Sequence, residues 1–258
     1  TTTGALSLTG TGGNSDGIHI DAATTTTVDA PLTLTGTATG VSTDNRGIAI
    51  LNGGAVTSTG LASTGTITMT GTGSPNGTSG NHGILVSDAG STITSATSNI
   101  VLTGTGEGTS NNNRGITVEN GAAITSTAIG IPNLVLNLIG TGNDAQPNSW
   151  GVQVSGSGTI VSMIDGALLL SGASPGISDN GIRVTTGAVV ETTGTGSIGL
   201  QSNPFLTQQG DIQIDTGARV TSSNMLYVLS SGDLILEGGT NPGESALLQH
   251  TSGNTHLG

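Results

Sequence analysis

Apolar and polar positions alternate along this chain in short runs of three kinds, which follow one another in a fixed order. The first kind reads "LTLTGTA" from Leu32, the second "GIAI" from Gly47, and the third "GAVTST" from Gly54. Alternation over a few residues predicts a half-buried strand, because successive side chains of a strand point to opposite faces. Each repeat therefore predicts three short strands that turn leucine, isoleucine and valine toward a core.

The middle apolar residue of the first run marks the period of the repeat. These markers are Leu8, Leu34, Met69, Leu102, Leu138, Leu170, Leu200 and Leu236. Neighbouring markers lie 26 to 36 residues apart. Strands this short are not stable alone, and a supersecondary unit repeated at such a period is the signature of a solenoid. The sequence predicts that the markers are buried and stacked one above another.

We therefore expect an all-β protein, a right-handed parallel β-helix with a triangular coil. About eight coils of 26–36 residues would each carry three strands, and the usual crossover preference sets the hand. The glycines after the first strand and before the second are expected at corners with positive φ. A β-sandwich or propeller would place hairpin turns regularly, whereas "NG" occurs at different points of the repeat. The whole chain, 1–258, would form one solenoid domain, with the repeat clearest over 4–240 and an incomplete last coil at 241–258.

The motifs "LTGTG", "NRGI"/"NHGI" and "GA-x-[IV]-T-S" resemble the β-helical repeat regions of large secreted bacterial proteins, of the filamentous-haemagglutinin and autotransporter type. The resemblance covers essentially residues 4 to 240. It implies a stalk, an adhesin shaft or an extracellular fibre. It carries over no catalytic residue, because the matched positions are structural.

The charge and composition of the chain limit the classes of partner and site that it can have. The chain contains sixteen acidic residues, four arginines and no lysine, which gives a net charge of −12. This balance argues against nucleic acid and anionic membrane surfaces. No apolar run approaches the roughly 18 residues of a membrane span. The absence of cysteine excludes disulfides and thiolate metal sites. Because the chain starts with Thr and has no signal peptide, we expect a mature product or an excised fragment.

Candidate chemistry is sparse. The acids are scattered, and Asp21, Glu119 and Asp215 follow the second strand in coils one, four and seven, roughly 14 Å apart at ~4.8 Å per coil. That spacing is too wide for a catalytic carboxylate pair. We therefore predict no catalytic, cofactor-binding or metal-ligating residue. Corners such as "NSD" and "GND" leave a surface Ca²⁺ open as a minor alternative, although the nonapeptide calcium repeat is absent.

The residue between the two inward positions of the first strand is another candidate surface. This column begins with Ser7, Thr33 and Thr68, and a flat rank of threonines could order water as in ice binding. It then changes to Val101, Asn137, Leu169, Gly199 and Ile235. The interruption argues against an ice-binding face. The later apolar members indicate either a contact with another subunit or cover by a loop such as Ser223 to Gly232.

The residue before each second-strand glycine forms a further column. Its members, called here the corner stripe, are Asp16, Arg46, His82, Arg114, Trp150, Asn180 and Gln209. In register they would lie ~5 Å apart along one edge, with Arg46 beside Asp16 and Arg114 against the Trp150 ring. The corner either tolerates any side chain or forms a contact strip for a subunit or a glycan.

Together these patterns predict a non-catalytic structural protein, a subunit or repeat segment of an extracellular filament. The expected partner is the chain itself, stacked head to tail. The alternative is the shaft of a secreted or surface adhesin that binds glycan or another cell. A β-helix enzyme acting on polysaccharide is the lesser alternative.

Overall fold

The computed structural model describes residues 4–60, 64–131, 133–143, 148–174, 180–202, 210–237, 246–250 and 255–257. These residues form twenty-five strands, and every strand pairing among them is parallel. Within these ranges no helix is long and apolar enough to span a lipid bilayer.

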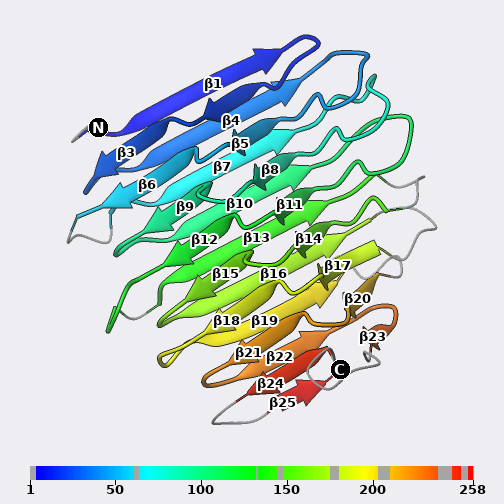
Figure 1. Ribbon diagram of the computed structural model, residues 1–258. Coiled ribbons are helices and arrows are strands. Elements are labelled where there is room, and N and C mark those ends of the chain that lie inside the picture. Colours follow the sequence, from blue (N-terminus) through cyan, green and yellow to red (C-terminus); the bar gives the residue numbers. More distant parts are fainter. Residues whose placement is uncertain are drawn as a thin grey trace.

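Three sheets run the length of the molecule, and each takes every third strand of the chain (Figure 1). The first sheet consists of β1 (Leu6–Gly12), β4 (Leu32–Ala38), β7 (Ile67–Thr72), β10 (Ile100–Thr105), β13 (Val135–Thr141), β16 (Ala167–Ala173), β19 (Ser197–Ser202), β22 (Leu226–Leu229) and β25 (Thr255–Leu257).

The second sheet consists of β2 (Ile18–Asp21), β5 (Ile48–Leu51), β8 (Ile84–Ser87), β11 (Ile116–Glu119), β14 (Val152–Ser155), β17 (Asn180–Thr185), β20 (Asp211–Ile214) and β23 (Leu234–Leu236). The third sheet consists of β3 (Thr24–Val28), β6 (Ala55–Thr59), β9 (Thr92–Ser95), β12 (Ala123–Ser126), β15 (Ile160–Met163), β18 (Val189–Thr192), β21 (Arg219–Ser222) and β24 (Leu247–His250).

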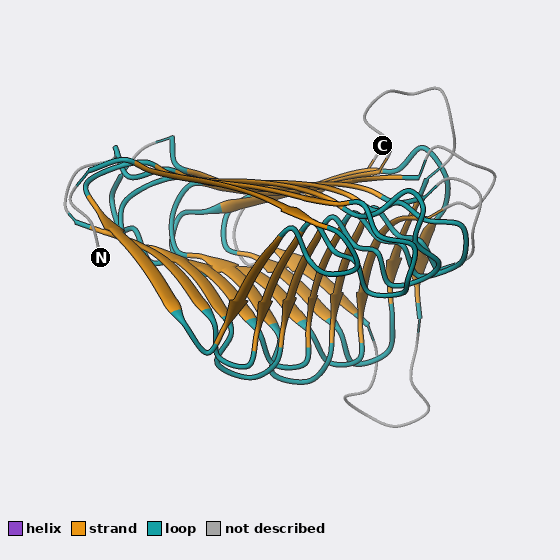
Figure 2. Ribbon diagram, turned by 90° about the horizontal axis from the view of Figure 1, so that it is seen from above, coloured by secondary structure: helices purple, strands orange, loops and turns teal. Residues whose placement is uncertain are grey.

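The predicted right-handed parallel β-helix of about eight coils is confirmed. Seen from above, the first sheet forms a nearly flat wall, and the other two sheets are inclined to it around the core (Figure 2). The last strands, β24 and β25, continue the third and first sheets, so the region expected to be an incomplete coil extends the stacking.

The predicted core ladder is confirmed over its central members. Leu34, Met69, Leu102, Leu138, Leu170 and Leu200 occupy one register and are at most 1% exposed. Leu8 shares this register but is 41% exposed, because β1 is the outermost strand of its sheet. The assignment of Leu236 to the ladder was wrong.

The eighth strand of the first sheet is β22, not the run from Leu234. Val228 pairs with Leu200, whereas Leu234 pairs with Ile212 of the second sheet. The segment treated as a covering loop therefore contains a strand of the wall itself. Ile235 leaves the outward column of the first sheet, and Tyr227 takes the place beside Gly199.

The glycines of "TGT" and "GI" were predicted to have positive φ, and this prediction was wrong. Neither Gly104 nor Gly115 has a φ in the left-handed region. A Cβ on Gly104 would lie 2.2 Å from the carbonyl oxygen of Gly115, so the two strands of a coil pass with their backbones in contact. The corresponding glycines of the other coils make the same approach, as at Gly36 with Gly47 and Gly71 with Gly83. Side chains are excluded at these positions by space.

Positive φ occurs instead in the tight turns between the second and third sheets. Asn52 and Gly53 have φ values of 51° and 83°, and Asn120 and Gly121 have 58° and 86°. Asparagine and glycine tolerate this region better than other residues. These two "NG" pairs therefore join parallel strands around a corner and do not form hairpins.

Candidate functional site

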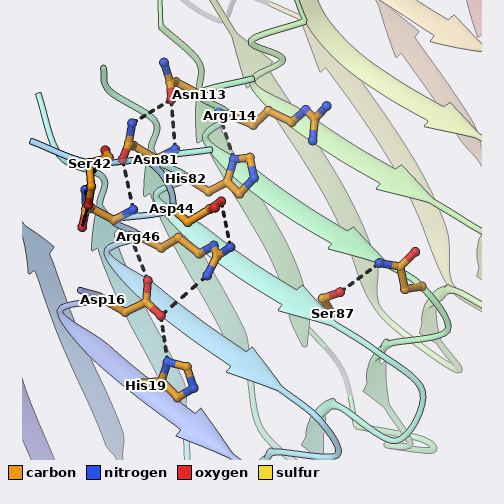
Figure 3. A network of polar contacts seen from close by, with 12 residues as sticks. Asp16, His19, Ser42, Asp44, Arg46, Asn81, His82, Ser87, Asn113 and Arg114 are labelled. Atoms are coloured by element: carbon orange, nitrogen blue, oxygen red, sulfur yellow. Dashed lines mark hydrogen bonds and ion pairs between the residues drawn. The ribbon is translucent and has the colours of Figure 1, made fainter. Parts of the chain in front are cut away.

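An asparagine ladder lies where the loops from the first sheet enter the second sheet (Figure 3). The Asn45 backbone N–H donates to Oδ1 of Asn81 at 3.0 Å, and the Asn81 N–H donates to Oδ1 of Asn113 at 2.9 Å. The Asn113 N–H continues to Oγ of Ser149 at 3.2 Å. All four side chains belong to residues that are at most 1% exposed. Each coil thus satisfies a buried N–H of the coil before it.

The ladder accounts for the recurrent "NRGI" and "NHGI". The amide group of Asn113 also donates to the carbonyl oxygens of Thr78 and Ser110, and that of Asn45 donates to the Ser42 carbonyl at 2.8 Å. A buried amide that meets several backbone groups is costly to replace, because its partners would be left unpaired. The asparagine is therefore structural, and the following residue is free to vary.

The corner stripe lies in register over its first five members. The N–H groups of Gly17, Gly47, Gly83 and Gly115 donate to the carbonyl oxygens of Arg46, His82, Arg114 and Trp150 at 2.9–3.0 Å. Asn180 begins β17 and pairs with Asp211, where a register shift interrupts the ladder. Gln209 lies outside the described residues. The stripe is thus continuous from Asp16 to Trp150.

The expected pairing of Arg46 with Asp16 is confirmed. Nη1 of Arg46 lies 3.7 Å from Oδ2 of Asp16, and Nη2 lies 3.0 Å from Oδ1 of Asp44. Asp16 also accepts the Arg46 backbone N–H and contacts the imidazole of His19 at 2.8 Å (Figure 3). This carboxylate therefore fixes the entry to the second coil through the Arg46 backbone N–H as well as through the side chains of Arg46 and His19.

The expected stacking of Arg114 on Trp150 was wrong. The cation over the Trp150 ring is Arg183, at 5.5 Å from the ring centre, and its Nη2 pairs with Oδ2 of Asp215 at 2.7 Å. Arg114 instead donates to Asn112 and to the carbonyl oxygen of Asn148. Arg183 projects outward from the middle of β17, so it reaches the ring from the neighbouring strand rather than from the stripe.

His82 is enclosed between two arginine-bearing coils. It is 6% exposed, and its Nδ1 accepts the Arg114 backbone N–H at 3.2 Å. Burial, and then the charges of Arg114 and Arg46, lower the pKa of His82 well below its ordinary value. The ring is therefore neutral, with its proton on Nε2.

The depressed pKa of His82 predicts a loss of stability in acid. The unfolded chain binds a proton at this ring below about pH 6.5, whereas the folded chain does not, so stability falls with decreasing pH by up to ~1.4 kcal/mol per unit. We expect the stability difference between wild type and His82→Gln to narrow as pH decreases from 7 to 5. Denaturant titrations at several pH values measure it, and an unchanged difference would contradict a buried neutral imidazole.

The outer face of the second sheet is largely covered. Ala49, Leu85, Thr117 and Gln153 point away from the core, yet each is at most 6% exposed, and Trp150 is 5% exposed. Among the described residues, Oγ1 of Thr117, Oε1 of Gln153 and Nε1 of Trp150 are buried without a hydrogen-bond partner. His82 and Trp150 are therefore packed residues of this corner, and a contact role for the partly exposed Arg46 and Arg114 stays a prediction.

The three acids expected to follow second-sheet strands are distributed along the rod. Asp21, Glu119 and Asp215 lie at the ends of strands in coils one, four and seven, as expected from the repeat. Burial raises the pKa of Glu119, and Arg114 and Arg46 oppose this shift. No group of three or more metal-ligating side chains occurs among the residues described.

Sequence reasoning missed Arg183 as the cation over the Trp150 ring, and it missed Asp215 as the partner of Arg183. The signal available was the outward arginine of "GIRV" and the acid that follows "DIQI" one coil later.

Comparison of this chain with protein-family models, with curated proteins and with solved structures gave no match.

Proposed function

We propose that this chain is a non-catalytic rod segment of an extracellular filament. The observation that carries the proposal is the in-register stacking of equivalent strands in all three sheets around one apolar core. Each coil contacts its neighbours, and stability in such arrays comes from the coils and the interfaces between them. A stack of this kind resists bending, which suits a load-bearing fibre.

The polar groups support the same proposal. The asparagine ladder and the Asp16–Arg46 contacts bond one coil to the next rather than converging on a cleft. Arrangements that bind substrate bring polar groups together at one point. In this corner they are distributed along the axis, which stiffens a rod.

In the filament, copies of the chain would stack head to tail, with β1 of one copy beside β25 of another. The test is electron microscopy of the purified chain at increasing concentration, with antibodies against it used on intact source cells. Fibres of uniform width that lengthen with concentration, together with labelled surface fibres, are expected. Label confined to the cell interior would contradict an extracellular role, and single short rods at all concentrations would contradict self-stacking.

The shaft of an adhesin is the second candidate, favoured by a surface pocket of about 310 Å³ on the first sheet. Leu169 and Tyr227, 36% and 45% exposed, stand on either side of Gly199, and Asn137 and Gln201 add amide groups. An aromatic face beside amides suits a sugar ring. Glycan-array binding that is lost in Tyr227→Ala would support this candidate, and equal binding by both chains would contradict it.

A further inference from the structure

A rectangular grid of hydroxyl side chains covers the outer face of the first sheet in its N-terminal half. The grid comprises the outward positions of β1, β4, β7 and β10. The members with a hydroxyl group are Ser7, Thr9, Thr11, Thr33, Thr35, Thr37, Thr68, Thr70, Thr72, Thr103 and Thr105, and the remaining position is occupied by Val101. Strand pairing places them in three columns, because each strand is in register with the next. We call this surface the threonine grid.

The column that begins with Ser7 is the least regular of the three. It changes to Val101 in the fourth coil, whereas the next column keeps threonine from Thr9 to Thr103. The outermost column continues from Thr11 to Thr141 through five coils. The interruption that argued against an ice-binding face is therefore confined to one edge of the grid.

The hydroxyl groups of the grid are available to external water. Within the described part of the chain, none of them makes an intramolecular hydrogen bond. This contrasts with the corner, where asparagine side chains are bonded inside the protein. The four strands of the grid also contain no charged and no aromatic residue. Each threonine presents one hydroxyl and one methyl group and is held at χ1 by its branched Cβ.

The geometry of the grid is that of a flat lattice. Neighbouring strands are ~4.8 Å apart, and alternate residues along a strand are ~6.6 Å apart. The first sheet is nearly flat in the view along the rod (Figure 2). These two repeats are close to the spacings between oxygen rows on exposed planes of hexagonal ice. A rigid surface with such spacings holds water molecules in ice-like positions without deforming.

We propose that the threonine grid binds ice crystals. The hydroxyl groups hydrogen-bond water at lattice positions, and the methyl groups exclude water from the intervening hollows. Because the backbone ladder already fixes the side chains, little conformational entropy is lost on adsorption. Ice is favoured over a crystalline polysaccharide because the grid lacks the aromatic rings that stack on sugars. This activity is independent of the structural role proposed above.

The third sheet supplies a matched control surface. Its outward column contains Thr57, Thr94 and Thr125, but Ala55 and Ala123 lie in the adjacent column. In addition, the Thr94 and Thr125 hydroxyls bond each other at 3.3 Å. These threonines share chemistry and strand register with the grid, but they do not form a two-dimensional array.

The test compares wild type, Thr70→Lys and Thr57→Lys in thermal hysteresis and ice-recrystallisation assays. Thr70 is exposed at the middle of the grid, so a lysine there places a strongly hydrated charge on the flat surface. We expect activity in wild type and in Thr57→Lys. In Thr70→Lys the concentration needed to stop recrystallisation should rise about tenfold, equivalent to ~1.4 kcal/mol.

Thr70→Val provides a second variant, because it keeps the shape and the methyl groups and should retain most of the activity. Circular dichroism and thermal unfolding establish that each variant is folded. No ice activity in the folded wild type, or equal loss in Thr57→Lys and Thr70→Lys, would overturn the proposal. Binding to microcrystalline cellulose or chitin without ice activity would overturn it in favour of a polysaccharide surface.

Discussion

Replacing Leu102 by aspartate is expected to destabilise the central coils by roughly 4 kcal/mol or more. Leu102 is fully buried and stacks between Met69 and Leu138 in the core of the first sheet. The change removes apolar contacts to both neighbouring coils and brings a carboxylate into a site with no polar partner. Because a solenoid is stabilised between neighbours, the damage should be greatest in the coils next to the substitution.

The matched control is Val101→Asp, one residue earlier on the same strand. Val101 points outward and is partly exposed, so its replacement should change stability by no more than ~0.5 kcal/mol. Denaturant unfolding followed by circular dichroism gives the overall change, and hydrogen exchange locates it along the rod. A folded Leu102→Asp protein with the midpoint of wild type would show that the assigned inward face is wrong.

The fold could be predicted from sequence because apolar and polar residues alternate within each strand of the repeat. Leu34, Met69 and Leu102 recur at equivalent positions, and parallel stacking is the arrangement that buries all of them at once. The assignment of strands to sheets failed near the C-terminus, where the strand patterns are less distinct. "LYVL" and "LILEGG" both alternate, and the second was assigned to the first sheet as a weakened copy of its strand pattern, whereas the first is the strand that pairs there.

Two further strands show the limits of the pattern. The third strand of the first coil, β3 (Thr24–Val28), was not predicted, because four threonines carry no apolar alternation. It forms by pairing with β6, so a neighbouring coil supplies what the local sequence lacks. Leu8 has the sequence of a core residue and is nonetheless exposed, since burial depends on a coil on each side.

The candidate sites were less predictable than the fold. The register of the corner stripe followed from the repeat, and so did the contact between Arg46 and Asp16. The burial of His82 and Trp150 did not follow, because the alternation within a strand indicates which side chains face the core but not how closely the outward ones are packed. The threonine grid is visible only when all three outward positions of a strand are aligned between coils, which requires the register of each pair.

Replacing Gly104 by alanine is expected to destabilise the protein by ~3 kcal/mol although it adds a single methyl group. The new Cβ would lie 2.2 Å from the Gly115 carbonyl oxygen and 2.7 Å from a side-chain carbon of Ile116. Real Cβ atoms do not approach backbone oxygen so closely. The first and second strands of the coil would have to separate, and both are hydrogen-bonded to coils above and below.

Gly13→Ala is the control, and its effect should have the opposite sign. A Cβ on Gly13 meets nothing within 4 Å, and its φ does not lie in the left-handed region. Alanine there restricts the unfolded chain and should raise stability by ~0.4–1 kcal/mol. The two variants, compared by thermal and denaturant unfolding, separate loss of space from loss of backbone freedom. Equal effects in both would show that the glycines of "TGT" are retained for flexibility, and the proposed close contact between the strands of a coil would then be incorrect.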